Sequence, residues 1–361
     1  MKILFIVRSI GMGGATKQLA MTANAFINYG YNVSVYSYCW TTPYDGLSKQ
    51  IKYIPSKNYK KLNEYCLAIR NIRKTIIQEN PDIVISWRTN AGCFTRIATL
   101  GLKCKVIFSE RTDPYMESSL FLKLASWVCN FSDGAVFQTD KARDYYHKLV
   151  SKSVVIPNPF DCNILPDIVP IDRRKKEIAV VGRFFMVQKR QDIMIDAFSI
   201  IHKALPDYKL VFYGDGIDKD KIKKIVIDKG LENHTIFKGA VKDVINQLKN
   251  SRLLVLTSDY EGIPNVILEA FAAGTPVVST DCSPGGASFL IDNGECGFIV
   301  PIRDVKAISD KSIQLINDNK KSMIFINNGR NKLKNFKYEK IASLWNDYIL
   351  SILKDKSPQN L

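Results

Sequence analysis

The chain has 361 residues, of which 46% are hydrophobic, so two domains can each bury a core. No apolar run approaches the roughly 18 residues of a membrane-spanning helix, and the N-terminal run lacks a signal-peptide cleavage site, so we expect a cytoplasmic protein. Eight cysteines without a C-x-x-C pair and three scattered histidines disfavour zinc and redox chemistry. The net charge of +16 indicates a negatively charged partner: nucleic acid, an anionic membrane surface or phosphorylated substrates.

In the first half of the chain, short Ile- and Val-rich runs alternate with segments long enough for helices. This order predicts a parallel, doubly wound α/β sheet. The predicted strands are residues 3–7, 32–38, 83–86, 106–109 and 134–138, and residues 153–159 close the run.

The same pattern restarts after a proline-punctuated linker at residues 163–170. We therefore expect two Rossmann-like domains, residues 1–165 and 166–337, with a C-terminal helix at 338–361 that packs back on the first domain. The predicted strands of the second domain are residues 178–181, 209–213, 235–238, 253–257, 276–279 and 297–300, with helices at 190–204 and 265–273.

A glycine-rich loop, Gly11-Met12-Gly13-Gly14-Ala15, follows the first strand. It is similar to the start of a dinucleotide fingerprint, but Thr16 stands where the third glycine is needed and the second strand ends without an acidic residue. A nicotinamide cofactor is therefore disfavoured. The loop instead predicts a turn that lets the first helix approach another ligand.

A second loop begins at Gly182, which lets its strand turn sharply, and continues through Arg183 to Lys189. We expect these two cations to project near one another. Together they could neutralise a leaving diphosphate in place of a metal ion. The alternative is two solvated charges on a loop.

The segment from Ser258 to Ala270 carries the sharpest signal. Pro264 suits the first turn of a helix, whose free amides can hold a diphosphate. Glu269 lies on that helix and can accept two hydrogen bonds from a ribose, whereas Glu261 precedes the helix and would face a sugar ring. The alternative is a capping loop with one surface glutamate.

A literal D-x-D sequence occurs at Asp218-Lys219-Asp220, and such a pair can hold a metal ion. Here it opens a predicted helix, where acidic side chains offset the helix dipole. We therefore expect no metal site at these residues.

These elements together resemble the retaining glycosyltransferases of family 4, which have the GT-B fold, in their bacterial polysaccharide and O-antigen type. The resemblance rests on the E-x7-E spacing of Glu261 and Glu269, on Gly182-Arg183 with Lys189, on the glycine loop, and on Ile156-Pro157-Asn158. It implies two Rossmann-like domains facing a central cleft. It also implies catalytic roles for Glu261, Arg183 and Lys189, and donor-binding roles for Glu269, Gly13, Gly14, Gly182, Gly262, Ile263, Pro264 and Asn265.

The chain departs from the family pattern in two places. Thr16 and Lys17 stand where many relatives have an acid and an arginine. No histidine occurs in residues 108–113, so Glu110, Arg111 and Asn90 are the candidate acceptor-side residues. Residues 281–287 are similar to a segment of polysaccharide transferases, many of which use UDP-hexoses or UDP-N-acetylhexosamines.

The positive charge is concentrated between Lys49 and Lys74, where eight basic residues accompany one acid, Glu64. Apolar residues at 62, 66, 69, 72 and 76 follow helical spacing. This predicts an amphipathic basic helix suited to an anionic lipid surface or a lipid diphosphate, with an ordinary surface helix as the alternative. No nucleic-acid-binding motif accompanies the charge, so a nucleic-acid partner is not expected.

The predicted function is transfer of a sugar from a nucleotide-sugar donor to a growing, lipid-linked bacterial surface glycan, with retention of anomeric configuration and without a cofactor or metal. The expected location is the inner face of the cytoplasmic membrane. Two alternatives stay open: a sugar-nucleotide epimerase of the same fold, and a non-catalytic scaffold of a polysaccharide assembly complex.

Overall fold

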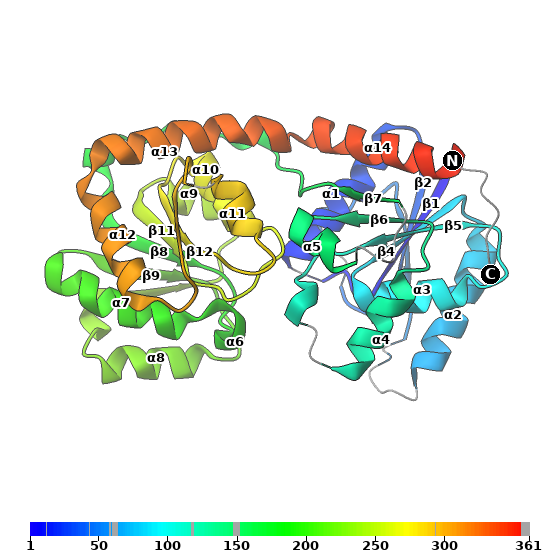
Figure 1. Cartoon of the computed structure of the whole chain (residues 1–361), viewed down its shortest axis with the longest axis horizontal. Coiled ribbons are helices and arrows are strands. Elements are labelled where there is room, and N and C mark those ends of the chain that lie inside the picture. The colour runs from blue at the N-terminus through cyan, green and yellow to red at the C-terminus, as the bar shows by residue number, and fades with distance from the viewer. Residues whose placement is uncertain are drawn as a thin grey trace. The chain divides into compact units, whose positions relative to one another are not determined.

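The computed structural model describes residues 1–11, 13–42, 44–57, 59, 64–116, 119–146, 152–292 and 294–354. The chain divides into two compact α/β units (Figure 1). Unit 1 comprises Met1–Pro159 with Phe336–Leu361, and unit 2 comprises Phe160–Asn335. The boundary thus lies a few residues before the one expected after residue 165.

Unit 1 is built on a sheet whose seven described strands are all parallel, in the order β3-β2-β1-β4-β5-β6-β7. The central strand β4 is buried along its whole length, as expected where helices cover both faces of a sheet. The strands are β1 Lys2–Val7, β2 Asn32–Ser37, β3 Lys52–Pro55, β4 Ile83–Trp87, β5 Lys105–Ser109, β6 Gly134–Phe137 and β7 Ser153–Val155.

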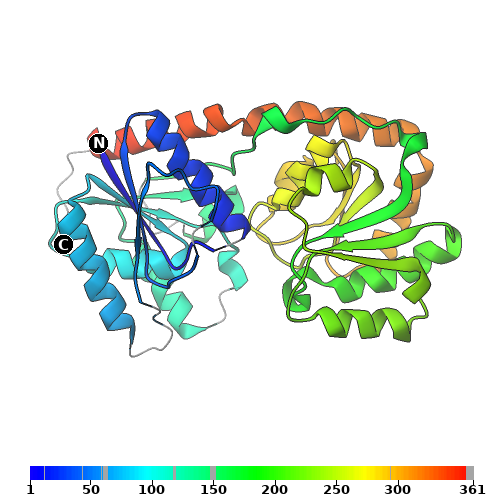
Figure 2. The ribbon, with the colours of Figure 1, turned by 180° about the vertical axis from the view of Figure 1, so that it is seen from behind.

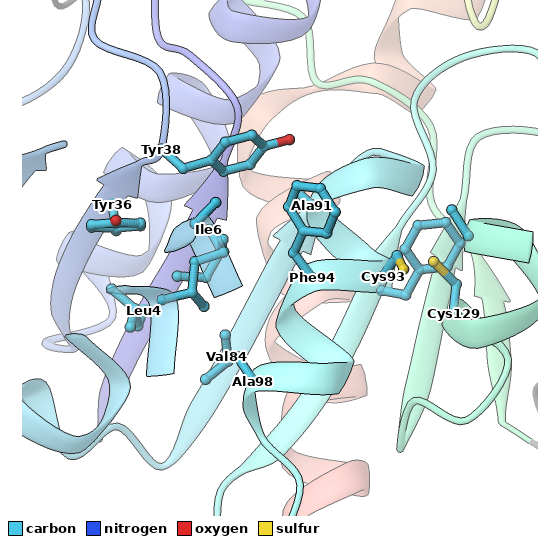
Figure 3. Packing of buried hydrophobic residues seen from close by; sticks show 14 of the residues in the cluster. Leu4, Ile6, Tyr36, Tyr38, Val84, Ala91, Cys93, Phe94, Ala98 and Cys129 are labelled. Atoms are coloured by element: carbon cyan, nitrogen blue, oxygen red, sulfur yellow. The ribbon is translucent and has the colours of Figure 1, made fainter. Parts of the chain in front are cut away.

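Two sets of helices cover this sheet. The α1 and α14 helices lie side by side on one face, where Phe26 and Trp345 enter the core (Figures 1 and 2). The α2, α3 and α4 helices cover the other face, where Ile72 and Phe94 pack on Leu4 and its neighbours (Figure 3). The helices are α1 Gly14–Asn28, α2 Tyr65–Glu79, α3 Thr89–Ala98, α4 Leu120–Cys129, α5 Asp140–Tyr145 and α14 Tyr338–Lys354, with a short 3-10 helix at Pro114–Met116.

Unit 2 has a second parallel sheet, with its described strands in the order β10-β9-β8-β11-β12-β13. They are β8 Lys175–Val181, β9 Lys209–Tyr213, β10 Thr235–Gly239, β11 Ser251–Leu256, β12 Val277–Thr280 and β13 Phe298–Val300. The α-helices are α6 Met186–Lys189, α7 Gln191–Ala204, α8 Lys219–Asp228, α9 Val244–Leu248, α10 Asn265–Ala273, α11 Gly286–Ile291, α12 Val305–Asn317 and α13 Asn319–Lys332. Short 3-10 helices occur at Cys162–Ile164, Ile171–Arg173, Glu232–His234 and Leu333–Phe336.

The predicted basic helix between Lys49 and Lys74 is wrong in its extent. Lys52 lies on the edge strand β3, which the sequence reading missed, and α2 begins only at Tyr65. Lys60, Lys61 and Leu62 lie outside the described residues. The stripe at Ile69, Ile72 and Ile76 packs into the core of unit 1, so it does not face a lipid surface.

Within the described residues, no helix combines the length and apolarity that crossing a bilayer requires.

Candidate active site

The candidate site of unit 2 lies where the strand order of its sheet reverses. Strands β8 and β11 are neighbours, yet their connections run to opposite sides of the sheet. Ligands of open α/β sheets bind outside the carboxyl ends of the strands at such a point. The loop that starts at Gly182 follows β8 and the loop that carries Glu261 follows β11, so the fold brings these two predicted elements to the same edge.

Lys189 and Glu261 form an ion pair at this edge, between Nζ and Oε1. The two side chains are only 18% and 11% exposed, so the pair is largely shielded from water. The hydroxyl of Ser258 also donates to Glu261 Oε1 at 2.8 Å. Two of the predicted catalytic residues therefore lie in direct contact, which their separation in sequence did not reveal.

The loop that carries Glu261 is fixed by backbone contacts. The amide of Asp259 donates to the Gln188 carbonyl at 2.9 Å, and the amide of Glu261 donates to the Ser283 carbonyl at 2.8 Å. The backbone of Gly286 packs so closely on Gly262 that an added Cβ would lie 1.8 Å from the Gly262 carbonyl oxygen. Only glycine fits there, so the start of α11 holds the loop in place.

Helix α10 begins directly after this loop, at Asn265. Pro264 precedes it without a side-chain cap, and its first turn contains no acidic residue. The N-terminal amides and the positive end of the helix dipole can therefore act on an anion. Ile263 and Pro264 are buried, whereas Glu269 is half-buried further along the same helix.

Arg183 does not share the ion pair of Lys189. Its side chain is exposed, and its guanidinium carbon lies 5.1 Å from the ring centre of Phe185. Its backbone carbonyl accepts a hydrogen bond from Gln191 Nε2 at 2.9 Å. The arginine thus stays on the solvent side of the loop that Gly182 opens.

Sequence reasoning missed an arginine cluster that holds the Glu261 loop. The buried carboxylate of Asp259 accepts hydrogen bonds from Arg303 Nη2 at 2.7 Å and from Arg303 Nε at 3.1 Å, and Arg190 Nη1 lies 3.5 Å away. Both arginines have positive φ, 48° at Arg190 and 60° at Arg303, a region that residues other than glycine rarely adopt. Nothing in the residue types signals this pairing.

The D-x-D residues take local roles. Asp218 Oδ2 accepts a hydrogen bond from the Met186 amide at 2.9 Å, and this bond lowers the pKa of Asp218. Asp218 also pairs with Lys221 at 3.2 Å, while Asp220 lies in the first turn of α8. Asp218 therefore anchors the start of α6, the short helix that ends at Lys189. Among the described residues, no group of three or more His, Cys, Asp and Glu side chains is arranged to hold a metal ion.

In unit 1, Gly13 and Gly14 lie at the start of α1, after β1, while Met12 lies outside the described residues. Gly13 precedes the first helical residue, and no side chain caps the helix there. No side-chain cap among the described residues therefore has to be displaced by a ligand at this helix end, and the predicted close approach stays a prediction.

The candidate acceptor-side residues are largely used inside unit 1. Glu110 is 1% exposed, and its carboxylate accepts hydrogen bonds from the Arg111 and Thr112 amides and from the Thr89 hydroxyl. The guanidinium of Arg111 lies 4.5 Å from the ring centre of Trp87, and burial lowers its pKa to about 9. This geometry favours structural roles for Glu110 and Arg111. Asn90 differs, because its buried Oδ1 has no hydrogen-bond partner in the described part of the chain.

Two protein-family models match successive parts of the chain. Residues 12–164 match the model of Glycosyltransferase Family 4, and residues 163–332 match that of Glycosyl transferases group 1.

A Campylobacter jejuni α-1,4-N-acetyl-D-galactosaminyltransferase acting on a diNAcBac-PP-undecaprenol-linked glycan is 25% identical, covering 96% of this chain and 97% of that protein. An Erwinia amylovora amylovoran biosynthesis glycosyltransferase, AmsD, is 23% identical, covering 96% of this chain and 99% of that protein. The structure of Anabaena Alr3699/HepE with UDP and glucose superposes with a TM-score of 0.81 at 20% identity, covering 97% of this chain and 100% of that one. The two family models together span both units, and the chain belongs to the family 4 glycosyltransferases of GT-B fold.

Proposed function

We propose that this glycosyltransferase moves a hexose or N-acetylhexosamine from a UDP-sugar to a growing, lipid-linked bacterial surface glycan, with retention of anomeric configuration and without a metal ion. The observation that carries the proposal is the shielded Lys189–Glu261 pair beside the uncapped start of α10. A cation and the positive end of a helix dipole at one edge suit a diphosphate. The donor class is supported by the UDP bound in the HepE structure, and the acceptor class by the names of the Campylobacter and Erwinia relatives.

In this mechanism, departure of the nucleotide diphosphate is the difficult step, because negative charge grows on its oxygens. Lys189 and the first amides of α10 stabilise that charge, and Arg183 reaches it from the exposed side of its loop. Glu269 accepts hydrogen bonds from the ribose hydroxyls. Donor binding must exchange the Lys189–Glu261 contact for contacts with diphosphate and sugar, which frees Glu261 to face the sugar ring.

A donor panel tests the proposal. Purified protein is incubated with UDP- and GDP-sugars, and nucleotide release is measured with and without a lipid-diphosphate-linked acceptor. Acceptor-dependent release with UDP-sugars is expected. Release or isomerisation of the donor sugar without any acceptor would instead indicate the epimerase. Donor binding without turnover under all conditions would indicate the scaffold.

Metal independence has its own test. Activity is expected to survive EDTA, because Lys189, Arg183 and helix amides take the place of a cation. Loss of activity in EDTA that manganese restores would contradict this expectation. Asp218 and Asp220 would then be the candidate metal ligands.

An anionic membrane surface remains part of the proposal, at a different place from the one expected from sequence. Along α4 the side chains of Leu120, Leu124 and Trp127 are 74%, 55% and 56% exposed, and their spacing places them along one face of the helix. Lys123 is exposed beside them. An exposed apolar ridge with a nearby cation is typical of a surface that rests on anionic lipid.

A further inference from the structure

The carboxyl edge of the unit 1 sheet brings three polar residues into one row. Strand β1 pairs with β2 through Val7 and Ser37, and with β4 through Ile6 and Ser86. The residues that follow these strands, Arg8, Tyr38 and Arg88, therefore occupy neighbouring positions. Side chains alternate between the faces of a strand, so Arg8 shares the face of Leu4 and Ile6, which is also that of Tyr38.

Tyr38 carries a hydroxyl without a protein partner. Its side chain is 3% exposed, and its ring packs on Phe94 of α3 with 5.5 Å between the ring centres. In the described part of the chain its Oη has no hydrogen-bond partner. Figure 3 shows the hydroxyl directed away from Leu4 and toward the side of the cluster where Ala91 of α3 lies. A buried hydroxyl is costly without a partner, so this one is suited to a ligand.

The surroundings of this hydroxyl are positively charged. Arg8 and Arg88 are both exposed, and neither forms an ion pair within the described residues. Burial raises the pKa of Tyr38, and the positive charges of Arg8 and Arg88 act in the opposite direction.

Helix α3, of ten residues, starts directly after Arg88 with neither a side-chain cap nor an acidic residue in its first turn. Arg88 itself adopts φ of 78°, a strained conformation that tends to occur at functional sites.

We propose that Arg8, Arg88, the Tyr38 hydroxyl and the first turn of α3 bind a phosphoryl group carried by the acceptor. Two cations, a hydroxyl donor and the positive end of the α3 dipole match the several oxygens of a phosphate. Lys189 and α10 of unit 2 are already assigned to the donor diphosphate, so we assign the phosphate of unit 1 to the second substrate. The inference rests on the proposed transfer reaction. The phosphate could be that of a lipid diphosphate or of a polyol-phosphate chain.

The first experiment measures phosphate binding without turnover. Inorganic phosphate is titrated into the full chain and into Arg8→Gln, Arg88→Gly and Tyr38→Phe variants by calorimetry. Glycine at position 88 removes the side chain while tolerating the positive φ, and Arg88→Lys keeps the charge. Each loss of a cation is expected to weaken binding about tenfold, and Tyr38→Phe somewhat less, because charged hydrogen bonds are the stronger ones.

The matched control is Arg70→Gln, which removes another exposed cation of unit 1, on α2. It should bind phosphate as the unchanged protein does, and Arg88→Lys should recover most of the affinity. Equal binding by all variants, or an equal loss in the Arg70 variant, would overturn the proposal.

The second experiment compares acceptors that carry the same sugar on different groups: a short prenyl diphosphate, a polyol phosphate, and a neutral alkyl chain. One phosphorylated acceptor should have a KM about tenfold or more below that of the neutral glycoside, and this gap should close in the Arg8 and Arg88 variants while donor affinity stays unchanged. The preferred acceptor identifies the phosphate source. A shift in donor KM instead, or no preference in the unchanged protein, overturns the inference. If no acceptor is used although the donor binds, the transfer proposal fails by itself, and the phosphate titration still decides whether the site exists.

Discussion

The carboxyl edges of the two sheets differ in how their charges are paired. In unit 2, Lys189 contacts Glu261, and Arg190 and Arg303 surround Asp259, so the protein itself pairs these three basic side chains with acids, whereas Arg183 has no acidic partner among the described residues. In unit 1, Arg8 and Arg88 form no ion pair in the part of the chain that the structure describes. The edge of unit 2 is therefore largely neutralised before its ligand binds, whereas the edge of unit 1 retains the positive charge of Arg8 and Arg88.

This difference predicts how each ligand binds. At the edge of unit 2 a ligand must replace an existing contact, so affinity is the difference between two sets of interactions. At the edge of unit 1 an anion gains new contacts without breaking any. Substitutions in unit 2 should therefore change turnover and donor binding, whereas those in unit 1 should mainly change affinity for the acceptor.

The largest expected effect follows from removal of the Lys189 amine. Lys189→Ala should lower turnover by roughly 10²–10³, the usual scale for one preorganised electrostatic donor. Single-turnover nucleotide release measures the effect. Lys306→Ala is the matched control, because Lys306 is an exposed lysine of the same unit that pairs with Asp310. A loss below tenfold would mean that the lysine only neutralises Glu261.

Substitutions of the two glutamates should separate effects on donor binding from effects on turnover. Glu269→Ala should weaken donor binding by about 1.5–3 kcal/mol, since it removes hydrogen bonds to a charged acceptor. Glu261→Gln should depress turnover more than donor affinity, because it also leaves Lys189 without its partner. Calorimetric titration with UDP-sugar and steady-state kinetics distinguish the two. Unchanged donor affinity in the Glu269 variant would remove the ribose assignment.

A smaller effect is expected from the arginine that holds the Glu261 loop. Arg303→Ala should lower kcat by up to about tenfold with little change in donor Kd, because 58% of the Arg303 side chain is exposed and solvent weakens its pair with Asp259. Arg303→Gly should lower kcat equally, yet melt at a higher temperature than Arg303→Ala, because glycine relieves the positive φ. Recovery of kcat in Arg303→Lys would support positioning by charge. Identical melting temperatures for the alanine and glycine variants would show that the positive φ at position 303 does not strain the backbone.

The smallest effect concerns the apolar ridge of α4. The double variant Leu124→Ser with Trp127→Ser should reduce co-sedimentation with anionic vesicles about fivefold, since each side chain is already half-exposed and buries only part of its area in lipid. Higher salt should weaken the binding of the unchanged protein. Leu350→Ser on α14 is the control, because Leu350 is 38% exposed on the same unit. Equal sedimentation of all three proteins would exclude this ridge as a membrane contact.

Most strands could be predicted from sequence, because runs such as Ile83–Trp87 are buried on both sides and therefore apolar throughout. The edge strand β3 escaped prediction because it is short, starts with a lysine and ends in a proline. The predicted site residues after β8 and β11 were brought to one edge because parallel strands share their carboxyl ends. The Lys189–Glu261 contact and the arginines around Asp259 could not be predicted, since they depend on backbone conformations that residue types do not encode.

The return of α14 to unit 1 has a consequence for the order of synthesis. Trp345, Ile349 and Ile352 fill the face of the unit 1 sheet that α1 covers only in part. They are translated after the whole of unit 2, Phe160–Asn335. At about 5–20 residues per second, the nascent first unit waits on the order of ten to thirty seconds for its last helix. During that interval the apolar face stays uncovered, so folding of unit 1 is completed only after α14 has been synthesised.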